Sequence, residues 1–485
     1  MRGDRRGALS VRFDLPLLEL ESDSGASFPV ENPADGETLA EVPRMGAAET
    51  ERALRSAEEA LPAWRGLLAK ERARILRNWA DAMTDNADQL ARLLTLEQGK
   101  PLFESQAEIA YAASFLEWFG EEAKRVYGDT IPTYMHDRRV VVTKDPIGVT
   151  AGITPWNFPA AMVTRKAAPA LAAGCTMVLK PAEQTPLSAL AVARLGLEAG
   201  LPQGVLGIVT GSSEDAPVIG RVLTGSPVVR KLGFTGSTEV GKLLMAQCAA
   251  GVKKVSLELG GNAPFIVFDD ADLDAAVAGA LLCKYRNSGQ TCISANRIYV
   301  QEPVHDAFVE RLAAAASALP VGSGLDPDVK VGPLIERQAI DKVERHVADA
   351  LERGGELVTG GESMGGLFYR PTVITGVPPE AAMAREETFG PVAAIARFTA
   401  EEEAIRAAND TPYGLAAYFY SRDMGRIWRV SEALEYGILG INTGFISTEV
   451  APFGGVKESG IGREGSRYGI DEWLEIKYLC MGGVE

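Results

Sequence analysis

Residues 234–241 decide the fold, and they read Phe-Thr-Gly-Ser-Thr-Glu-Val-Gly. The apolar run 228–234 predicts a β-strand before the turn, and residues 238–249 predict a helix after it. Gly236 allows a tight turn between the two elements, and Ser237 lies where the N-terminus of the helix could bind a phosphate. Because strand-to-helix turns are common, this segment alone leaves a nucleotide site and an ordinary βα connection both open.

Strand-like and helical stretches alternate on both sides of this turn. Residues 47–127 have a helical pattern and are rich in Ala, Glu, Arg and Leu. The strand-like runs after them are residues 140–143, 147–153, 176–180, 207–210 and 263–268. Such alternation is typical of βαβ units and a parallel sheet, so the predicted fold class is α/β. A chain of 485 residues is too long for one core, and without a repeat or a low-complexity linker its lobes are expected to interleave.

Composition limits the partners that this chain can bind. The formal net charge is −16, so nucleic acid and anionic membranes would be repelled, and we expect neither as a partner. An anionic ligand would need local cations to hold it. No segment approaches the roughly 20 apolar residues of a membrane span, so the expected location is the cytoplasm. The five cysteines and three histidines are scattered, which predicts neither a disulfide framework nor a catalytic metal.

Three short motifs carry polar residues at positions typical of functional sites. Lys-Pro-Ala-Glu at 180–183 follows a strand-like run, where open α/β sheets bind ligands, although a solvated charge pair fits equally well. Glu258 precedes Gly260 and Gly261, which indicates that the backbone passes close to another group. Cys292 ends the run Gly-Gln-Thr-Cys, a more polar setting than a typical buried cysteine has. No histidine lies nearby in the sequence, so a carboxylate is the expected base.

Seven motifs in a fixed order resemble the aldehyde dehydrogenase superfamily. They are Thr-Pro-Trp-Asn-Phe-Pro at 154–159, Lys-Pro-Ala-Glu at 180–183, the turn at 236–241, Glu-Leu-Gly-Gly at 258–261, Gly-Gln-Thr-Cys at 289–292, Glu-Glu-Thr-Phe-Gly-Pro at 386–391 and Pro-Phe-Gly-Gly at 452–455. The resemblance runs from about Asn32 to the C-terminus. Segments 257–270 and 462–466 are most similar to bacterial succinate-semialdehyde dehydrogenases. The resemblance implies a Rossmann-type cofactor domain, an α/β catalytic domain and a small β oligomerisation arm.

By this resemblance, three residues carry the chemistry. Cys292 is the nucleophile, which attacks the aldehyde carbon as a thiolate and forms first a thiohemiacetal and then a thioester. The Asn157 amide and the Cys292 backbone N–H would hold the oxyanion, since donors act best where charge develops. Glu258 would activate the water that hydrolyses the thioester, a task suited to a carboxylate with a raised pKa.

The resemblance also implies a bound NAD or NADP. The residues expected around it are Trp156, Lys180, Glu183, Gly236, Ser237, Gly241, Glu387 and Phe389. A carboxylate at Glu183 can accept a hydrogen bond from a ribose 2′-hydroxyl but repels a 2′-phosphate. This favours NAD, whereas Lys180 beside it would still tolerate NADP.

Two arginines near the nucleophile indicate an anionic substrate. Arg165 follows the Trp-Asn segment on a predicted helix, and Arg286 lies six residues before Cys292. Guanidinium groups bind carboxylates through two parallel hydrogen bonds, so the pair could hold a carboxylate distal to the aldehyde. The resemblance adds Ser447 as a hydroxyl donor to that carboxylate. A surface salt bridge is the alternative for each arginine.

With the resemblance, the predicted substrate is succinate semialdehyde. Glutarate semialdehyde is one methylene longer, and one methylene is worth only about 1–3 kcal/mol in a pocket, so it stays an alternative together with a broader range of aldehydes. A structural protein without chemistry is a further alternative, against which the intact Cys292, Glu258, Asn157 and Lys180 argue. A thioesterase that uses the same cysteine and glutamate without a nucleotide is another, against which the nucleotide motifs argue.

The resemblance divides the chain into three parts. These are an NAD(P)-binding domain at 1–127 and 147–258, a catalytic domain at 259–458, and an oligomerisation arm at 128–146 and 459–485. The alternating apolar pattern of residues 474–479 fits an edge strand that needs a partner chain. A homotetramer, arranged as a dimer of dimers, is therefore expected.

Overall fold

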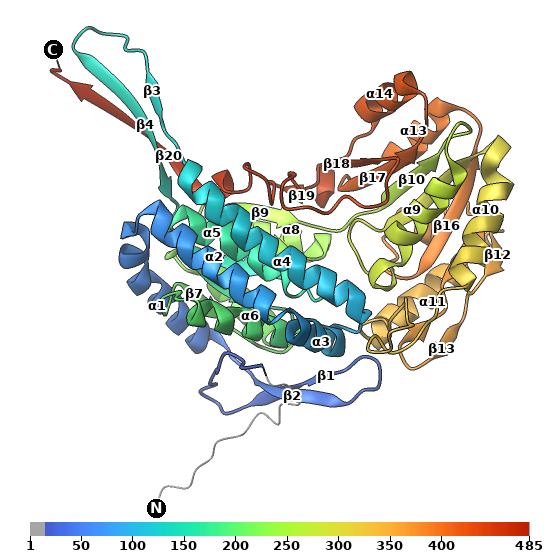
Figure 1. The fold of residues 1–485 in the computed structure, drawn as a ribbon, viewed down its shortest axis with the longest axis horizontal. Coiled ribbons are helices and arrows are strands. Elements are labelled where there is room, and N and C mark those ends of the chain that lie inside the picture. The colour runs from blue at the N-terminus through green and yellow to red at the C-terminus, as the bar shows by residue number, and fades with distance from the viewer. Residues whose placement is uncertain (1–14, 485) are drawn as a thin grey trace, which may run out of the picture.

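The structure, a computed structural model, describes residues 15–484 and is built around two large sheets (Figure 1). The strands of the first sheet are β5 (Val149–Ile153), β6 (Thr176–Lys180), β7 (Leu206–Ile208), β8 (Val229–Thr235), β9 (Lys254–Glu258) and β19 (Gly460–Ile461). Their order is β19-β9-β8-β5-β6-β7. All run parallel except β19, which is antiparallel to β9.

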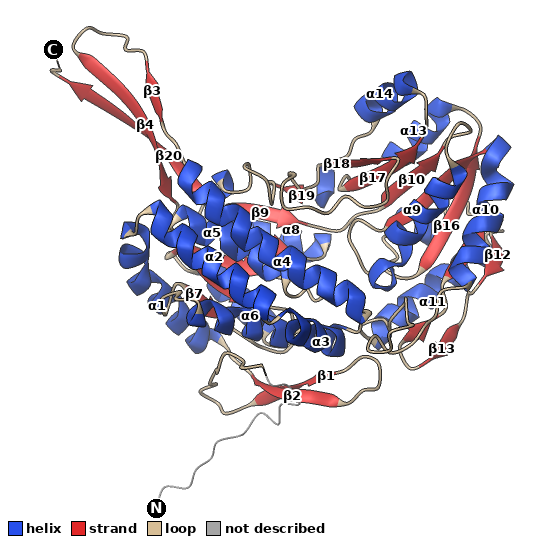
Figure 2. Ribbon diagram, in the orientation of Figure 1, coloured by secondary structure: helices blue, strands red, loops and turns tan. Residues whose placement is uncertain are grey.

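Helices cover both faces of this sheet, and side chains of its strands point alternately into two cores. One face carries α2 (Ala69–Asp85), α3 (Ala87–Gln98), α4 (Leu102–Glu122), α5 (Ala161–Ala173) and α6 (Pro186–Glu198). The other carries α1 (Ala47–Gly66), α7 (Ala216–Gly225) and α8 (Thr238–Ala249). Along β6, Met177 and Leu179 join the first core and Val178 the second, as the two-residue period of a strand dictates. Helix α5 is buried along its whole length, with α4 packed against it (Figure 2).

The second sheet follows the first in the chain. Its strands are β10 (Ala263–Val267), β11 (Ala295–Gln301), β12 (Glu356–Thr359), β15 (Thr372–Thr375), β16 (Val392–Phe398), β17 (Ala416–Tyr420) and β18 (Ile438–Ile441), in the order β12-β15-β16-β11-β10-β17-β18. Only β12 is antiparallel to its neighbour. The helices of this part are α9 (Leu273–Tyr285), α10 (Glu302–Ser317), α11 (Arg337–Glu352), α12 (Ala382–Arg385), α13 (Glu401–Asn409) and α14 (Met424–Ala433). The predicted α/β fold class is confirmed.

A three-stranded sheet projects from the body as an arm (Figure 1). It consists of β3 (Asp129–Ile131), β4 (Arg138–Pro146) and β20 (Leu474–Gly482), with β20 paired along the whole of β4. Two hairpins complete the structure, β1 (Ser27–Glu31) with β2 (Thr38–Pro43) and β13 (Ser363–Gly365) with β14 (Phe368–Tyr369). None of the helices in residues 15–484 combines the length and apolarity needed to cross a membrane.

Residues 459–485 are all expected in the arm, but in the structure they are divided between two sheets. Strand β19 joins the six-stranded sheet through β9, and only β20 lies in the arm. The sequence pattern could not separate the two, because a two-residue strand such as β19 has no period of its own. Residues 1–14 and 485 of the expected parts lie outside the described residues.

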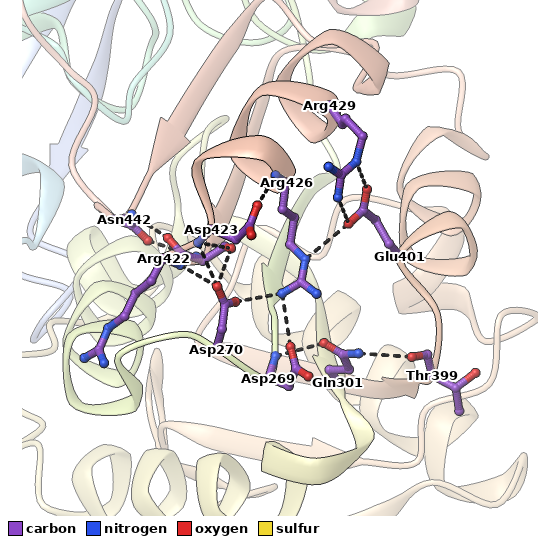
Figure 3. Close-up of polar contacts among 11 residues, drawn as sticks. Asp269, Asp270, Gln301, Thr399, Glu401, Arg422, Asp423, Arg426, Arg429 and Asn442 are labelled. Atoms are coloured by element: carbon purple, nitrogen blue, oxygen red, sulfur yellow. Dashed lines mark hydrogen bonds and ion pairs between the residues drawn. The ribbon is translucent and has the colours of Figure 1, made fainter.

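Charged side chains join the end of β10 to α13 and α14 (Figure 3). Asp270 accepts hydrogen bonds from the backbone N–H groups of Arg422 and Asp423, each at 2.8 Å. Arg426 reaches Asp270 at 2.8 Å and Glu401 at 3.1 Å. Burial alone would raise the pKa of Asp270, but these hydrogen bonds and the Arg426 charge bring it below its usual value. Arg426 therefore ties two helices to the sheet.

Replacing Arg426 by leucine should lower the thermal unfolding midpoint, because Asp270 and Glu401 lose a shared cation. We expect a loss of about 1–3 kcal/mol, the usual range for hydrogen bonds to charged groups. The control is Arg429→Leu, since Arg429 pairs with Glu401 from a position where its side chain is 61% exposed. Calorimetric midpoints that fall equally in both variants would contradict the role assigned to Arg426.

Candidate active site

Four of the predicted motifs meet at one edge of the six-stranded sheet. They are residues 154–159, 180–183, 236–241 and 258–262, which follow β5, β6, β8 and β9. Because these strands are parallel, their carboxyl ends lie at the same edge. The strand order also reverses between β5 and β8, and open α/β sheets bind ligands at such a point.

The chain crosses from the first sheet to the second through Gly260 and Gly261. A Cβ on Gly261 would lie 2.3 Å from the carbonyl oxygen of Cys292, closer than any side chain can approach. The Cys292 loop leads into β11, which pairs with β10 in the second sheet. The two glycines therefore bring the Cys292 loop against the segment that begins with Glu258.

The Cys292 thiol is half-buried at this junction. Burial, followed by the charges of Glu387 and Glu258, raises the pKa of Cys292 to about 12, although Arg165 lowers it. The thiol is therefore neutral at pH 7 in this state. Because the thiolate is the nucleophilic form of cysteine, a reaction at Cys292 has to begin with the loss of this proton.

Asn157 is held through its backbone carbonyl. Lys100 Nζ donates to this oxygen at 2.7 Å and Asn287 Nδ2 at 3.1 Å. The side-chain amide of Asn157 donates to the carbonyl of Gln290 at 3.0 Å. Since Gln290 is two residues before Cys292, the amide lies beside the Cys292 loop.

A buried ion pair that no sequence motif predicts lies next to the backbone of Asn157. Lys100 Nζ lies 2.6 Å from Glu108 Oε2, and both side chains are at most 1% exposed. The other Glu108 oxygen accepts the N–H groups of Ala160 and Ala161 at the start of α5. In the sequence, Gly-Lys-Pro at 99–101 indicates only a break between helices, and nothing local connects Lys100 with a residue 57 positions later.

Glu258 ends β9 with both carboxyl oxygens buried and without a hydrogen-bond partner among the described residues. Burial, followed by the charge of Glu464, raises the pKa of Glu258 well above its usual value. Arg165, Lys166 and Arg463 act in the opposite direction. A carboxyl group with a raised pKa and free oxygens is suited to exchange a proton with water.

Neither Arg165 nor Arg286 forms a surface salt bridge, the alternative role for each of them, in the described part of the chain. Arg165 is 3% exposed and pairs with Glu464 at 2.6 Å, and its Nη2 has no hydrogen-bond partner among residues 15–484. Arg286 is half-buried between the rings of Phe158 and Phe445, at 5.1 and 5.6 Å from their centroids. No ion pair of Arg286 occurs within the described residues.

Tyr111 lies near both arginines and is not among the predicted residues. Burial raises the pKa of Tyr111, whereas the nearby charges of Arg165 and Arg286 both lower it. Its hydroxyl is buried without a hydrogen-bond partner in the described structure. Ser447 is half-buried in the loop between β18 and β19, and within residues 15–484 no hydrogen bond joins it to either arginine.

The residues expected around the adenosine end lie at the ends of β6 and β8. Lys180 Nζ is 3.2 Å from Glu183 Oε2, so the two charges pair with each other. Ser237 caps α8, its hydroxyl accepting the N–H of Val240 at 3.3 Å. Gly241 packs under Leu259, where a Cβ would come within 2.4 Å of a methyl carbon. The N-terminus of α8 thus lies against the sheet edge.

The residues expected around the nicotinamide lie on the other side of the junction. Glu387 accepts the N–H of Gly261 at 3.1 Å, and burial raises its pKa to about 7. Phe389 adopts a positive φ of 55°, and its ring meets that of Trp156 edge-on at 5.5 Å. Lys284 lies near Glu387 with its Nζ buried and unpartnered among the described residues, and burial lowers its pKa to about 8.

These groups fit a dinucleotide. The free N–H groups of the first turn of α8 suit a pyrophosphate, and Lys180 with Glu183 suits a ribose at the neighbouring strand end. The buried Thr154 hydroxyl at the end of β5 has no partner among the described residues and is a further donor at this edge. No cluster of three or more His, Cys, Asp or Glu side chains that could hold a metal occurs within residues 15–484.

Comparison with known proteins identifies the family. Residues 20–479 match the family model described as the aldehyde dehydrogenase family. The chain belongs to the aldehyde dehydrogenase family. The resemblance found in the sequence is therefore confirmed. As an aldehyde dehydrogenase, the protein is an oxidoreductase.

Similar proteins cover nearly the whole aldehyde dehydrogenase chain. The glutarate-semialdehyde dehydrogenase of Pseudomonas aeruginosa is 62% identical over 96% of both chains. The succinate-semialdehyde dehydrogenase [NADP(+)] of Escherichia coli is 63% identical, also over 96% of both chains. The crystal structure of succinate-semialdehyde dehydrogenase from Burkholderia pseudomallei is 60% identical, with a TM-score of 0.95 over 98% of this chain and all of that one.

The Lys100–Glu108 pair generates a prediction for the aldehyde dehydrogenase reaction. Lys100→Met should lower kcat on the order of tenfold to a hundredfold, because the Asn157 carbonyl loses its charged donor and the amide loses its position. It should also destabilise the fold, since Glu108 is left buried without a counter-charge. Lys124→Met is the control, as Lys124 is 42% exposed in a surface ion pair.

The double variant Lys100→Met/Glu108→Gln separates the two effects, since glutamine keeps an acceptor for the N–H groups of Ala160 and Ala161. Removing both charges should restore much of the thermal stability, because no unpaired charge stays buried. It should not restore kcat. Recovery of kcat together with stability would mean that Lys100 contributes to folding alone.

Proposed function

We propose that this enzyme oxidises succinate semialdehyde to succinate, with NAD or NADP as the acceptor. The observation that carries the proposal is a pair of cations near Cys292, neither of which is fully paired among the described residues. Arg165 keeps an unpartnered Nη2, and Arg286 is half-buried between two rings. A carboxylate at the far end of a short aldehyde would accept hydrogen bonds from both, with the Tyr111 and Ser447 hydroxyls as further donors. The names of the Escherichia coli and Burkholderia pseudomallei relatives support this substrate.

In the proposed reaction, Cys292 attacks the aldehyde carbon as a thiolate. The Asn157 amide and the Cys292 backbone N–H would donate to the oxyanion of the thiohemiacetal, where negative charge develops. The C–H bond of the former aldehyde carbon then breaks, and its hydride would pass to a nicotinamide bound at the sheet edge, which leaves a thioester on Cys292. The residues proposed to hold the nucleotide are Trp156, Lys180, Glu183, Gly236, Ser237, Gly241, Glu387 and Phe389.

Glu258 would then act as the base for hydrolysis. Its free, buried oxygens can take a proton from a water molecule next to the thioester. The raised pKa makes the carboxylate a stronger base than an exposed glutamate, once it is ionised. The products are the carboxylic acid and the free Cys292 thiol.

We propose that both nucleotides are accepted. Glu183 can accept a hydrogen bond from the 2′-hydroxyl of NAD, which is the reason for the expected preference. Lys180 lies 3.2 Å from the same carboxylate and can offer its charge to a 2′-phosphate instead. The name of the Escherichia coli relative supports NADP.

Glutarate semialdehyde is the second candidate substrate. The Pseudomonas aeruginosa relative of that name is as similar to this chain as the Escherichia coli enzyme. The extra methylene changes pocket preference by about 1–3 kcal/mol, which is small enough for one pair of arginines to serve either acid. Kinetic comparison decides between them.

The assembly and the division into domains are also proposals. We propose a cofactor part at 1–127 and 147–258, a catalytic part at 259–458 and an arm built from 128–146 and β20. Strand β20 is an edge strand of the arm and carries exposed Ile476, Tyr478 and Leu479, which supports pairing with a second copy and a homotetramer. We also propose a cytoplasmic location, and the net charge of −16 argues against nucleic-acid and membrane partners.

The experiment that tests the function compares three aldehydes. Purified protein is mixed with succinate semialdehyde, glutarate semialdehyde or butanal, and formation of NADH and NADPH is recorded. We expect kcat/KM for succinate semialdehyde to exceed that for butanal by at least about tenfold. Equal turnover of butanal would contradict the anion site, and acid formation without added nucleotide would favour a thioesterase.

Arg286→Ala provides a residue-specific prediction. It should raise KM for succinate semialdehyde on the order of tenfold to a hundredfold, because a charged hydrogen bond to the carboxylate is lost. KM for butanal should change little, as butanal has no carboxylate. Arg194→Ala is the control, since Arg194 is 40% exposed and pairs with Glu198 on α6. Equal effects on both aldehydes would show that Arg286 is structural.

The raised pKa of Glu258 predicts the pH dependence of hydrolysis. The carboxylate is the active form, so hydrolysis of the acyl-enzyme should accelerate as the pH rises through the pKa of Glu258. The midpoint should lie well above the ordinary glutamate value. Decay of the acyl-enzyme after rapid mixing measures it, and a midpoint at the ordinary value would contradict the burial argument.

A further inference from the structure

Glu464 holds two cations beside Glu258. One of its oxygens lies 2.5 Å from Lys166 Nζ and the other 2.6 Å from Arg165 Nε. All three side chains are at most 8% exposed. Lys166 also donates to Thr235 Oγ1 at 2.7 Å, which fixes it at the end of β8. We call Arg165, Lys166, Glu258 and Glu464 the buried charge cluster.

Two residues that pair through their backbones, Glu464 and Phe453, hold Arg165 from two sides. Glu464 and Phe453 exchange both backbone hydrogen bonds at 2.8 Å, so they form a rigid pair. Glu464 binds the guanidinium through its Nε, and the Phe453 ring stacks under it at 3.9 Å. The Nη2 group has no partner among the described residues. The guanidinium is therefore held at one end and available at the other.

Glu258 lies against the Glu464–Phe453 pair without a hydrogen bond of its own to any described residue, since a Cβ on Gly454, next to Phe453, would lie 2.9 Å from Glu258 Oε1. The charged and titratable groups that act on Glu258 or its partner Glu464 are Arg165 and Lys166 on α5, Arg463 beside Glu464, Lys231 on β8, Tyr111 on α4, and Cys292. Lys231 is paired with Glu472 at 3.0 Å. Among these groups, Arg165 has an Nη2 donor without a partner in the described residues. Its charge also interacts with Glu258, Glu464 and Cys292.

We propose that Arg165 is a shared counter-charge, for which the carboxylate of the substrate and Glu258 compete, while Glu464 is the positioning residue that sets the balance. The inference rests on the proposed function, because it needs a substrate carboxylate at Nη2. An anionic acyl group bound there neutralises Arg165 and adds a negative charge to the cluster. Glu258 then ionises less readily than beside a neutral acyl group. The carboxylate of the substrate thus acts twice, first in binding and again in the hydrolysis of the thioester.

The test compares two acyl-enzymes of the wild-type protein. Succinate semialdehyde and butanal are each mixed rapidly with enzyme and nucleotide, and hydrolysis of the succinyl and butyryl thioesters is followed against pH. We expect the midpoint for the succinyl group to lie higher, on the order of one pH unit, as expected for one added charge at short range. Coincident midpoints would overturn the inference.

Variants separate Arg165 from Glu464. Glu464→Gln removes a negative charge next to Glu258, so both midpoints should move to lower pH while the difference between the substrates persists. Arg165→Met should abolish the difference, because the two acyl groups no longer share a cation with Glu258. Glu198→Gln is the control, since it removes a carboxylate 43% exposed on α6 and should leave both midpoints unchanged.

The outcomes distinguish this inference from the proposed function. If the wild-type enzyme shows no preference for succinate semialdehyde over butanal, the proposed function fails and the inference fails with it. If the preference is present and the two midpoints coincide, the inference alone fails. A merely structural Glu464 would lower the rates of both substrates and leave both midpoints where they are. Because the wild-type comparison needs no variant, an unfolded Glu464→Gln protein would not remove the test.

Discussion

Gly261 and Cys292 are in contact through their backbones, and the catalytic arrangement depends on this contact. A Cβ at position 261 would lie 2.3 Å from the Cys292 carbonyl oxygen, so a side chain there would push the cysteine loop away. A Cβ at Gly454 would similarly lie 2.9 Å from Glu258 Oε1. The nucleophile belongs to the second sheet and the proposed base to the first. Small residues at the junction allow the two sheets to bring them together.

Buried charge is the second constraint on this site. Moving charges out of water is costly unless they are paired, and two ion-paired groups of side chains lie at this site. Lys100 and Glu108 compensate each other and hold the backbone of Asn157. In the buried charge cluster, two cations face the Glu464 carboxylate, and burial raises the pKa of Glu258, so that the cluster carries one positive charge whenever Glu258 is protonated. That charge accounts for the proposed preference for a monoanionic aldehyde within a strongly acidic protein.

The sequence predicts the α/β class because apolar strands and helices alternate along it. Strands that are buried on both faces appear in the sequence as nearly continuous apolar runs. The sequence predicts Cys292, Glu258 and Asn157 as site residues because each lies in a short motif, and the two arginines because they lie close in the sequence to such motifs. It does not predict Lys100, Glu108, Lys166 or Glu464. Lys166 and Glu464 are 298 residues apart, and their pairing arises from the fold alone. The same holds for Arg165, whose ion pair with Glu464 no local pattern reveals.

The central claim is that Cys292 carries the acyl group and that Glu258 releases it. The most direct measurement is peptide mass mapping of the Glu258→Gln enzyme after mixing with succinate semialdehyde and nucleotide. The account predicts one succinyl group on the peptide that contains Cys292, together with one equivalent of reduced nucleotide and little further turnover. An unmodified Cys292 peptide, or undiminished steady-state turnover in this variant, would contradict the account.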